Sequence, residues 1–221
     1  MCGIAGFYHF ASQGEKSDGA LTAMRETLIH RGPDGGENFV SKDGRVGLSQ
    51  RRLAIIDLSS EAACPMQNDS ETLWITYNGE IYNFKTLREE LKKKGYHFRT
   101  QGDTEIVLKG YEEWGEGVVQ RLNGMFAFVL WDEANKKIFA ARDHVGVKPL
   151  YYALQNGAFY FGSEIKAILA HPDFKKSIAF ENISLYLTFG CLPAPHTLFK
   201  DIAKLPPAHS LTLSSNGTPT I

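Results

Sequence analysis

Residues 125–131 read Met125-Phe126-Ala127-Phe128-Val129-Leu130-Trp131, seven apolar residues in succession. A second apolar run, 137–141, follows after a five-residue connection, which predicts two antiparallel neighbouring strands. An antiparallel strand with one face in water would alternate apolar and polar residues, and residues 125–131 do not. Both faces of the predicted sheet must therefore be covered by other parts of the chain.

Apolar residues at helical spacing supply the covering layers. They predict helices over 18–30, 84–94 and 103–114, with Ser17, Asn83 and Asp103 as N-caps. Further strands are predicted at 3–10, 46–48, 53–58 and 73–77, a second hairpin at 150–154 and 158–162, and a short helix at 164–170. The economical arrangement is two antiparallel sheets packed face to face with helices outside, which is an α+β fold.

The composition excludes several classes of function. The chain has 221 residues, 43% of them hydrophobic and 22% charged, and its formal net charge of -1 offers no electrostatic basis for binding nucleic acid or an anionic membrane. No apolar run approaches the ~18 residues of a membrane span, and the N-terminus lacks a signal-peptide pattern, so a cytoplasmic protein is expected. The spacing of the three cysteines and seven histidines predicts neither a disulfide framework nor a metal site.

The first six residues, Met1-Cys2-Gly3-Ile4-Ala5-Gly6, place a thiol at the second position. If Met1 is removed, Cys2 carries a free α-amine beside its thiol. The amine titrates near ~7.7 to 8.0 and the thiol near ~8.5, so the amine can accept the thiol proton at neutral pH. Taken alone, a cysteine at position 2 is more simply explained as an ordinary small residue that opens a strand.

Three other features each have a plain structural interpretation and a functional one. The sequence Asn78-Gly79 after a strand is typical of a type I′ hairpin turn, yet its amide and backbone N–H would also form a two-donor site for an oxyanion. The pair Arg51-Arg52 is typical of a solvated surface, but a guanidinium can also form a fork with a carboxylate. Asp103 is explained by helix capping alone, or by binding a ligand.

Six motifs occur in the order found in class II glutamine amidotransferases. They are Met1-Cys2-Gly3-Ile4, Arg31-Gly32-Pro33-Asp34, Arg52-Leu53-Ala54-Ile55, Tyr77-Asn78-Gly79-Glu80-Ile81-Tyr82-Asn83, Gly102-Asp103-Thr104-Glu105 and Arg142-Asp143-His144-Val145-Gly146-Val147-Lys148-Pro149-Leu150-Tyr151-Tyr152. The chain resembles this family over essentially its whole length. Among its branches, the motifs are most similar to those of the glutamine-hydrolysing asparagine synthetases.

The resemblance implies a four-layer αββα sandwich of the N-terminal nucleophile hydrolase type over residues 1–189. Residues 190–221 are proline-rich and are expected to be an irregular segment that connects to a synthetase domain. By the same resemblance, Cys2 attacks the side-chain amide of glutamine, a thioester forms, ammonia leaves, and water then releases glutamate. Asn78 and Gly79 would form the oxyanion hole.

The resemblance also assigns the binding residues. Arg52 would hold the α-carboxylate of glutamine, Glu80 and Asp103 would hold its α-ammonium group, and Leu53 and Ile55 belong to the same substrate-binding motif. No cofactor is expected in this chain, whereas ATP and magnesium are implied for the synthetase domain. Glutamine and that domain are the expected partners, and a homo-oligomer is left open. Cys64 and Cys191 match no functional position and are interpreted as structural.

Two alternatives to a glutaminase that supplies asparagine synthesis remain at this point. The first is an amidotransferase domain whose ammonia goes to a different acceptor. The second is a non-catalytic remnant that has kept only the fold, which predicts a missing nucleophile or carboxylate clamp. All the residues of the implied site are present in the sequence.

Overall fold

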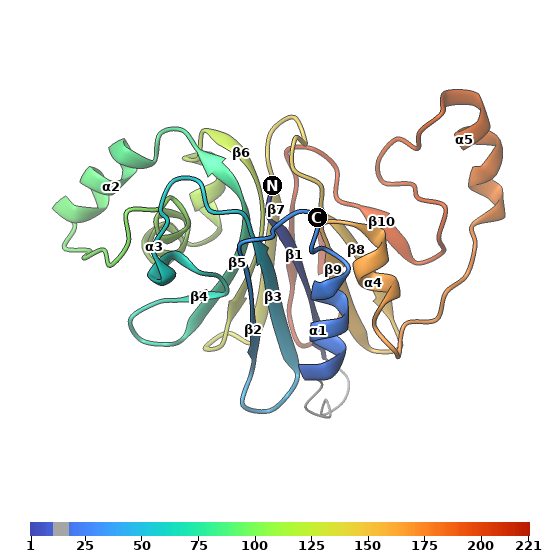
Figure 1. Ribbon diagram of the computed structural model, residues 1–221, viewed down its shortest axis with the longest axis horizontal. Coiled ribbons are helices and arrows are strands. Elements are labelled where there is room, and N and C mark those ends of the chain that lie inside the picture. Colours follow the sequence, from blue (N-terminus) through green and yellow to red (C-terminus); the bar gives the residue numbers. More distant parts are fainter. Residues whose placement is uncertain (11–17) are drawn as a thin grey trace.

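Two six-stranded antiparallel sheets form the centre of the molecule, shown in the computed structural model of Figure 1, which describes residues 1–10 and 18–221. The strand order is β10-β8-β9-β1-β3-β2 in sheet A and β12-β11-β7-β6-β5-β4 in sheet B. Sheet A contains β1 (Gly3–His9), β2 (Gly35–Val40), β3 (Val46–Arg52), β8 (Tyr151–Gln155), β9 (Ala158–Gly162) and β10 (Ile202–Lys204). Sheet B contains β4 (Met66–Gln67), β5 (Leu73–Ile81), β6 (Gly124–Asp132), β7 (Lys137–Arg142), β11 (Ser210–Leu213) and β12 (Pro219–Thr220).

Helices cover the outer face of each sheet. In Figure 1, α1 (Asp18–Glu26) and α4 (Ile165–Leu169) lie on one side, and α2 (Phe84–Lys93) and α3 (Thr104–Trp114) lie on the other. The remaining α-helix, α5 (Ile183–Phe189), projects from the sandwich and has no buried residue. Short 3-10 turns occur at Ser60–Ala62, Gly115–Gln120 and Phe180–Asn182.

The apolar strand β6 divides its side chains between two cores. Phe126, Phe128 and Leu130 pack toward α2 and α3. Ala127, Val129 and Trp131 point the other way and pack against sheet A. A third core lies between sheet A and the helices α1 and α4. The predicted four-layer αββα sandwich is therefore confirmed, because both faces of β6 are buried.

The predicted helices and hairpins are present with small shifts in their ends. The first helix ends at Glu26 instead of continuing to residue 30, and turns follow it. Neither Asn83 nor Asp103 donates or accepts a side-chain capping hydrogen bond, although each stands at the N-cap position of its helix. The Asn83 amide instead holds residues 121 and 123. The predicted cap Ser17 lies outside the described residues.

One strand prediction near the motifs is wrong, and another strand is present but longer than predicted. Residues 53–58 form no strand, because β3 continues through Arg51 and Arg52 and the chain then leaves the sheet as a loop. The strand predicted at 73–77 continues to Ile81, so Asn78 and Gly79 lie inside β5 and pair with β6. The hairpin-turn interpretation of Asn78-Gly79 is therefore excluded. The edge strand β2 was not predicted, because its glycines resemble the preceding turn.

The C-terminal segment contains more regular structure than its prolines predict. Strand β10 pairs with β8 in sheet A, whereas β11 pairs with β7 in sheet B and with β12. Leu205, Leu211 and Leu213 lie in the core between the sheets. Residues 202–220 therefore complete the sandwich instead of forming an irregular connection.

Among the described residues, no helix is long and apolar enough to cross a bilayer, and no group of three or more His, Cys, Asp or Glu side chains is placed to hold a metal ion. Cys2, Cys64 and Cys191 are all free thiols.

The buried His171 is expected to make the fold sensitive to acid. The residue is 1% exposed, and its ring packs against Phe7 and Tyr160 and accepts a hydrogen bond from the Asp173 N–H at 3.2 Å through Nδ1. Burial lowers the pKa of His171 from 6.5 to about 4. Between these values the unfolded chain binds the proton and the folded chain does not, so stability decreases as the pH falls through this window, by up to about 3 kcal/mol.

Urea unfolding of the wild type and of His171→Gln at pH 7, 5.5 and 4 measures this contribution. We expect the wild type to lose more free energy of unfolding than the variant over this pH range. Equal losses in both proteins would show that His171 does not titrate in this window.

Candidate active site

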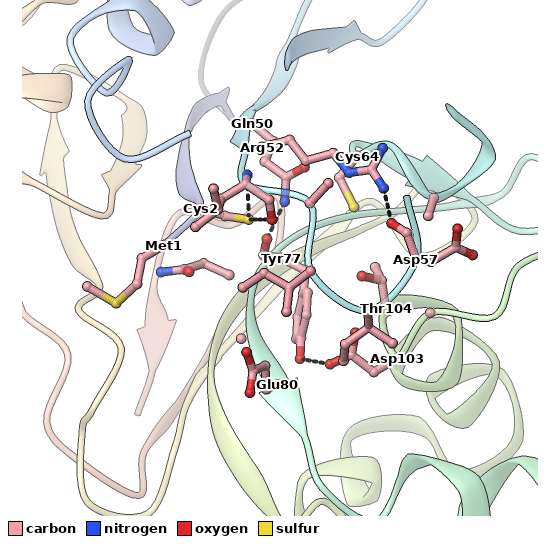
Figure 2. Close-up of a pocket in the computed structure, with 18 of the residues that line it drawn as sticks. Met1, Cys2, Gln50, Arg52, Asp57, Cys64, Tyr77, Glu80, Asp103 and Thr104 are labelled. Atoms are coloured by element: carbon pink, nitrogen blue, oxygen red, sulfur yellow. Dashed lines mark hydrogen bonds between the residues drawn. The ribbon is translucent and has the colours of Figure 1, made fainter. Parts of the chain in front are cut away.

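One cavity of about 220 Å³ collects every residue that the sequence analysis assigned to the site. In Figure 2, Met1 lies on one side of Cys2, Gln50, Arg52 and Cys64 lie on the other, and Glu80 and Asp103 lie farther along the cavity. The elements that contribute are the start of β1, the end of β3 with its following loop, β5 and the N-terminus of α3. The predicted residues that line the cavity are Cys2, Arg52, Leu53, Ile55, Asn78, Gly79, Glu80 and Asp103.

The Cys2 thiol is held against the loop that follows β3. Its sulfur accepts a hydrogen bond from the Leu53 N–H at 3.4 Å, and the thiol donates to the Leu53 carbonyl oxygen at 3.6 Å. The Arg31 Nε donates to the Cys2 carbonyl oxygen at 3.0 Å. Burial raises the pKa of the Cys2 thiol, while the Leu53 N–H and the positive charges of the N-terminus, Arg52 and Lys148 oppose this shift. Met1 precedes Cys2 in the structure, so the Cys2 nitrogen is a peptide nitrogen.

The Asn78 amide is buried without a hydrogen-bond partner among the described residues. The residue is 1% exposed, and its Nδ2 atom has no acceptor. Buried amide nitrogens in folded proteins almost always donate to an acceptor, because an unmet donor costs about 1–3 kcal/mol. An unmet donor that lines a cavity indicates that an acceptor from a ligand completes the site.

The backbone N–H of Gly79 points away from β6, to the open edge of β5. Phe126, opposite Gly79 in the register, donates its N–H to the Asp143 carboxylate and accepts from the Asp143 N–H, so this pair exchanges no hydrogen bond. N–H groups two residues apart in a strand point to the same edge, and the Ile81 N–H on that edge reaches the Asp103 carboxylate at 2.9 Å. A Cβ at position 79 would lie 2.6 Å from the Met125 carbonyl oxygen, so only glycine fits there.

The charged side chains are fixed by hydrogen bonds around the cavity. Arg52 donates to the Ser59 carbonyl oxygen at 2.8 Å and to that of Asp57. The Tyr77 hydroxyl donates to Asp103 Oδ2 at 2.6 Å. Burial raises the pKa of the Asp103 carboxyl, because the hydrogen bonds from Tyr77 and Ile81 offset only part of the loss of solvation. The cavity therefore contains the Arg52 guanidinium and the carboxyl groups of Asp57, Glu80 and Asp103.

The two arginines of the Arg51-Arg52 pair have different surroundings. Arg51 forms an ion pair with Glu26 of α1, which fixes β3 to the outer helix layer. Arg52, the next residue along the strand, lines the cavity. Alternation along a strand sends neighbouring side chains to opposite faces, so the two guanidiniums cannot serve the same purpose.

The cavity also contains residues that the sequence analysis did not assign. Gln50 donates its amide to the Tyr77 carbonyl oxygen and so ties β3 to β5. The Asp57 carboxylate accepts from the Gln101 N–H at 2.7 Å and joins the loops that carry Arg52 and Asp103. Tyr77 and Lys148 lie within the motifs quoted above, so the sequence contained a signal that could have placed them at the site. Gln50 and Asp57 gave no comparable signal, because their partners are distant in the sequence.

Cys64 also lines the cavity, although the sequence suggested a structural residue. It is buried, and burial raises its pKa to about 12. A thiol with this pKa stays protonated at neutral pH and is a poor nucleophile. Cys191 is exposed and lies away from this cavity. Cys2 is therefore the candidate nucleophile among the three cysteines.

Comparison with known proteins places the chain in a family. The glutamine amidotransferase domain family matches residues 1–220. The chain belongs to this family. Two predictions are thereby confirmed, namely the class II glutamine amidotransferase family and its relation to the asparagine synthetases.

Three similar proteins illustrate the match. This amidotransferase domain is 42% identical over 221 residues to asparagine synthetase [glutamine-hydrolyzing] 3 of Bacillus subtilis, covering 98% of this chain and 35% of that protein. It is 36% identical over 223 residues to a putative asparagine synthetase [glutamine-hydrolyzing] 2 of Methanocaldococcus jannaschii, covering 93% of this chain and 42% of that protein. The chain thus spans less than half the length of these relatives.

A solved structure supports the fold independently. The glutamine phosphoribosylpyrophosphate amidotransferase of B. subtilis superposes with a TM-score of 0.69 at 17% identity, covering 99% of this chain and 49% of that one. At this identity the likeness concerns the fold alone. It confirms that this amidotransferase domain shares its sandwich fold with that protein.

Proposed function

We propose that this amidotransferase domain hydrolyses glutamine to glutamate and ammonia through a thioester on Cys2. The ammonia is proposed to serve asparagine synthesis in a longer protein. The observation that carries the proposal is the buried Asn78 amide, which has no acceptor among the described residues and lines the same cavity as the Cys2 thiol. An oxygen that gains negative charge during attack by sulfur is the acceptor this donor lacks.

The proposed reaction begins after removal of Met1. The freed α-amine of Cys2 accepts the thiol proton, and the thiolate attacks the side-chain carbonyl carbon of glutamine. The carbonyl oxygen becomes an oxyanion that accepts hydrogen bonds from Asn78 Nδ2 and the Gly79 N–H. The C–N bond then breaks, the amine's proton passes to the leaving nitrogen, and ammonia departs. Water attacks the thioester in the same way, which releases glutamate and restores the thiol.

Charge complementarity supports free glutamine as the substrate. Free glutamine carries an α-carboxylate and an α-ammonium group, whereas glutamine within a peptide carries neither. We assign the carboxylate to Arg52 and the ammonium group to Glu80 and Asp103. Leu53 and Ile55 line the same cavity beside Arg52 and are proposed to contact the bound amino acid.

The ammonia acceptor is proposed from the relatives. The two relatives named above are both called asparagine synthetases, and each is much longer than this chain. We therefore propose that residues 190–221 lead into a synthetase domain that consumes the ammonia. ATP and magnesium, which the resemblance implies for that domain, enter no step proposed for this chain.

Mass spectrometry with a glutamine-analogue electrophile tests the proposal. The intact mass of the purified protein reports whether Met1 is removed, and the mass after treatment reports the labelled thiol. We expect a mature chain that begins at Cys2 and a single adduct on the peptide containing Cys2, with labelling blocked by excess glutamine. An adduct on any other residue, or glutaminase activity in a chain that retains Met1, would contradict the proposal.

Glutamine binding is expected to weaken as the pH falls toward the raised pKa of Asp103. The ammonium group of glutamine is attracted by the carboxylate form of Asp103, and protonation removes that charge. Calorimetric titration of glutamine into Cys2→Ala between pH 8 and pH 5 measures binding without turnover. We expect affinity to fall with pH in this protein.

In Cys2→Ala/Asp103→Asn, affinity should be low at every pH and nearly independent of pH. An affinity for glutamine that falls equally with pH in both proteins would assign the effect to another group.

A further inference from the structure

Lys148 is a nearly buried cation in the active-site cavity. The residue is 5% exposed and lines the cavity with Cys2. Its Nζ forms no hydrogen bond or salt bridge with any of the residues that the structure describes. Lysine is almost never buried unless it is paired, because water no longer solvates its charge.

The backbone of Lys148 is held rigidly in place. The Lys148 N–H donates to the Asp143 carboxylate at 2.9 Å, and its carbonyl oxygen accepts from Arg142 Nε at 2.8 Å. The same carboxylate accepts from the Val147 N–H at 2.9 Å, and the Arg142 guanidinium also donates to the carbonyl oxygens of Gly146 and Leu205 at 2.6 Å. A loop fixed this firmly cannot release the side chain to solvent without breaking buried hydrogen bonds.

An ammonium group that has no counter-ion and only limited access to solvent destabilises the free protein. A site retains such a group when its charge is balanced in another state, either by a ligand or by a group that becomes negative during reaction. The carboxyl groups that line this cavity belong to Asp57, Glu80 and Asp103, and none of them forms a salt bridge with Lys148. The cavity thiols are Cys2 and Cys64, and Cys64 stays protonated at neutral pH because burial raises its pKa to about 12.

We propose that the Lys148 ammonium group stabilises the Cys2 thiolate and the negative charge that develops when this thiolate attacks the substrate amide. The inference rests on Cys2 being the nucleophile of the proposed function. Lys148 keeps its proton throughout and forms no covalent bond. The thiol proton goes to the α-amine, and Lys148 acts on the sulfur through its charge.

Lys148 is the cation that remains available when substrate is bound. Three positive charges oppose the rise in the pKa of Cys2, namely the N-terminal ammonium group, Arg52 and Lys148. After removal of Met1, the N-terminal amine belongs to Cys2 and is the proposed base. This amine must be neutral to accept a proton, so it no longer supplies a positive charge. The charge of Arg52 is balanced by the α-carboxylate in the proposed complex. Arg31 approaches Cys2 through its carbonyl oxygen and is paired with Glu164 at 2.9 Å.

The rate of Cys2 alkylation by iodoacetamide tests the inference without glutamine. The rate is measured from pH 6 to pH 10 by quantifying the labelled peptide that contains Cys2, in protein shown by intact mass to begin at Cys2. Lys148→Met removes the charge while keeping an unbranched side chain. We expect the pH midpoint of alkylation to rise by about one unit and the rate at neutral pH to fall about tenfold. Lys148→Arg should retain most of the wild-type rate.

The exposed thiol of Cys191 is the internal control, since its alkylation should be the same in every variant. Lys148→Gln serves as a second neutral variant, and circular dichroism confirms that each protein is folded. A Cys2 alkylation rate and pH midpoint in folded Lys148→Met or Lys148→Gln equal to those of the wild type would overturn the inference. Because the assay contains no glutamine, that result would leave the proposed function standing. Glutaminase activity in Cys2→Ala would instead overturn the proposed function.

Discussion

Replacement of Cys2 by alanine is expected to lower kcat for glutamine hydrolysis by roughly 10⁴-fold or more, since no other group in the cavity can form the thioester. Cys64 lines the same cavity, but its pKa of about 12 keeps it protonated at neutral pH. Glutamate release from glutamine by the processed protein is the measurement. The binding residues are untouched, so glutamine should still bind to the variant.

Two comparisons make this result specific to an N-terminal nucleophile. Cys191→Ala removes an exposed thiol outside the cavity and should leave kcat unchanged. A chain with extra residues before Cys2 keeps the thiol and loses the α-amine, so its activity should fall close to that of Cys2→Ala. Full activity in the extended chain would mean that another base serves Cys2.

Replacement of Asn78 by alanine is expected to lower kcat by roughly 10²- to 10³-fold with little change in KM. The amide donates to the oxyanion, which exists only after attack, so its loss affects the transition state more than substrate binding. Thermal stability should change little, because the deleted Nδ2 has no partner among the described residues of the free protein. Steady-state kinetics and a melting curve on the same preparation measure both effects.

Asn68 provides a matched control for this variant. It is also a buried asparagine, but its amide donates to Ser70, Thr72 and Glu112, and its oxygen accepts from the N–H groups of Thr72 and Leu73. Asn68→Ala should therefore lower stability by about 1–3 kcal/mol and leave kcat of the folded protein unchanged. If Asn78→Ala lost stability but kept its kcat, Asn78 would be a structural residue.

The layers of the fold could be predicted because they depend on local patterns. The continuous apolar run in β6 required both of its faces to be covered. The helical spacing of apolar residues in α2 and α3 predicted the layer that covers one of these faces. Predictions failed where a local signal was outweighed by pairing with distant residues. Asn78-Gly79 has the composition of a turn, yet pairing with residues 126 and 127 keeps it inside a strand. The prolines of the C-terminal segment likewise obscured β10 and β11, which pair with β8 and β7 more than 45 residues earlier in the chain.

The sequence by itself determined the family, the layered architecture and the set of residues proposed to bind and cleave glutamine, because ordered motifs and periodicity are properties of neighbouring residues. Only the tertiary structure decided the environment of each of these groups. It left the Asn78 amide without an acceptor among the described residues, gave Cys64 a pKa of about 12, and enclosed the Lys148 side chain in the cavity that contains Cys2. These properties depend on solvation and on contacts between distant parts of the chain, which no local pattern of residues specifies.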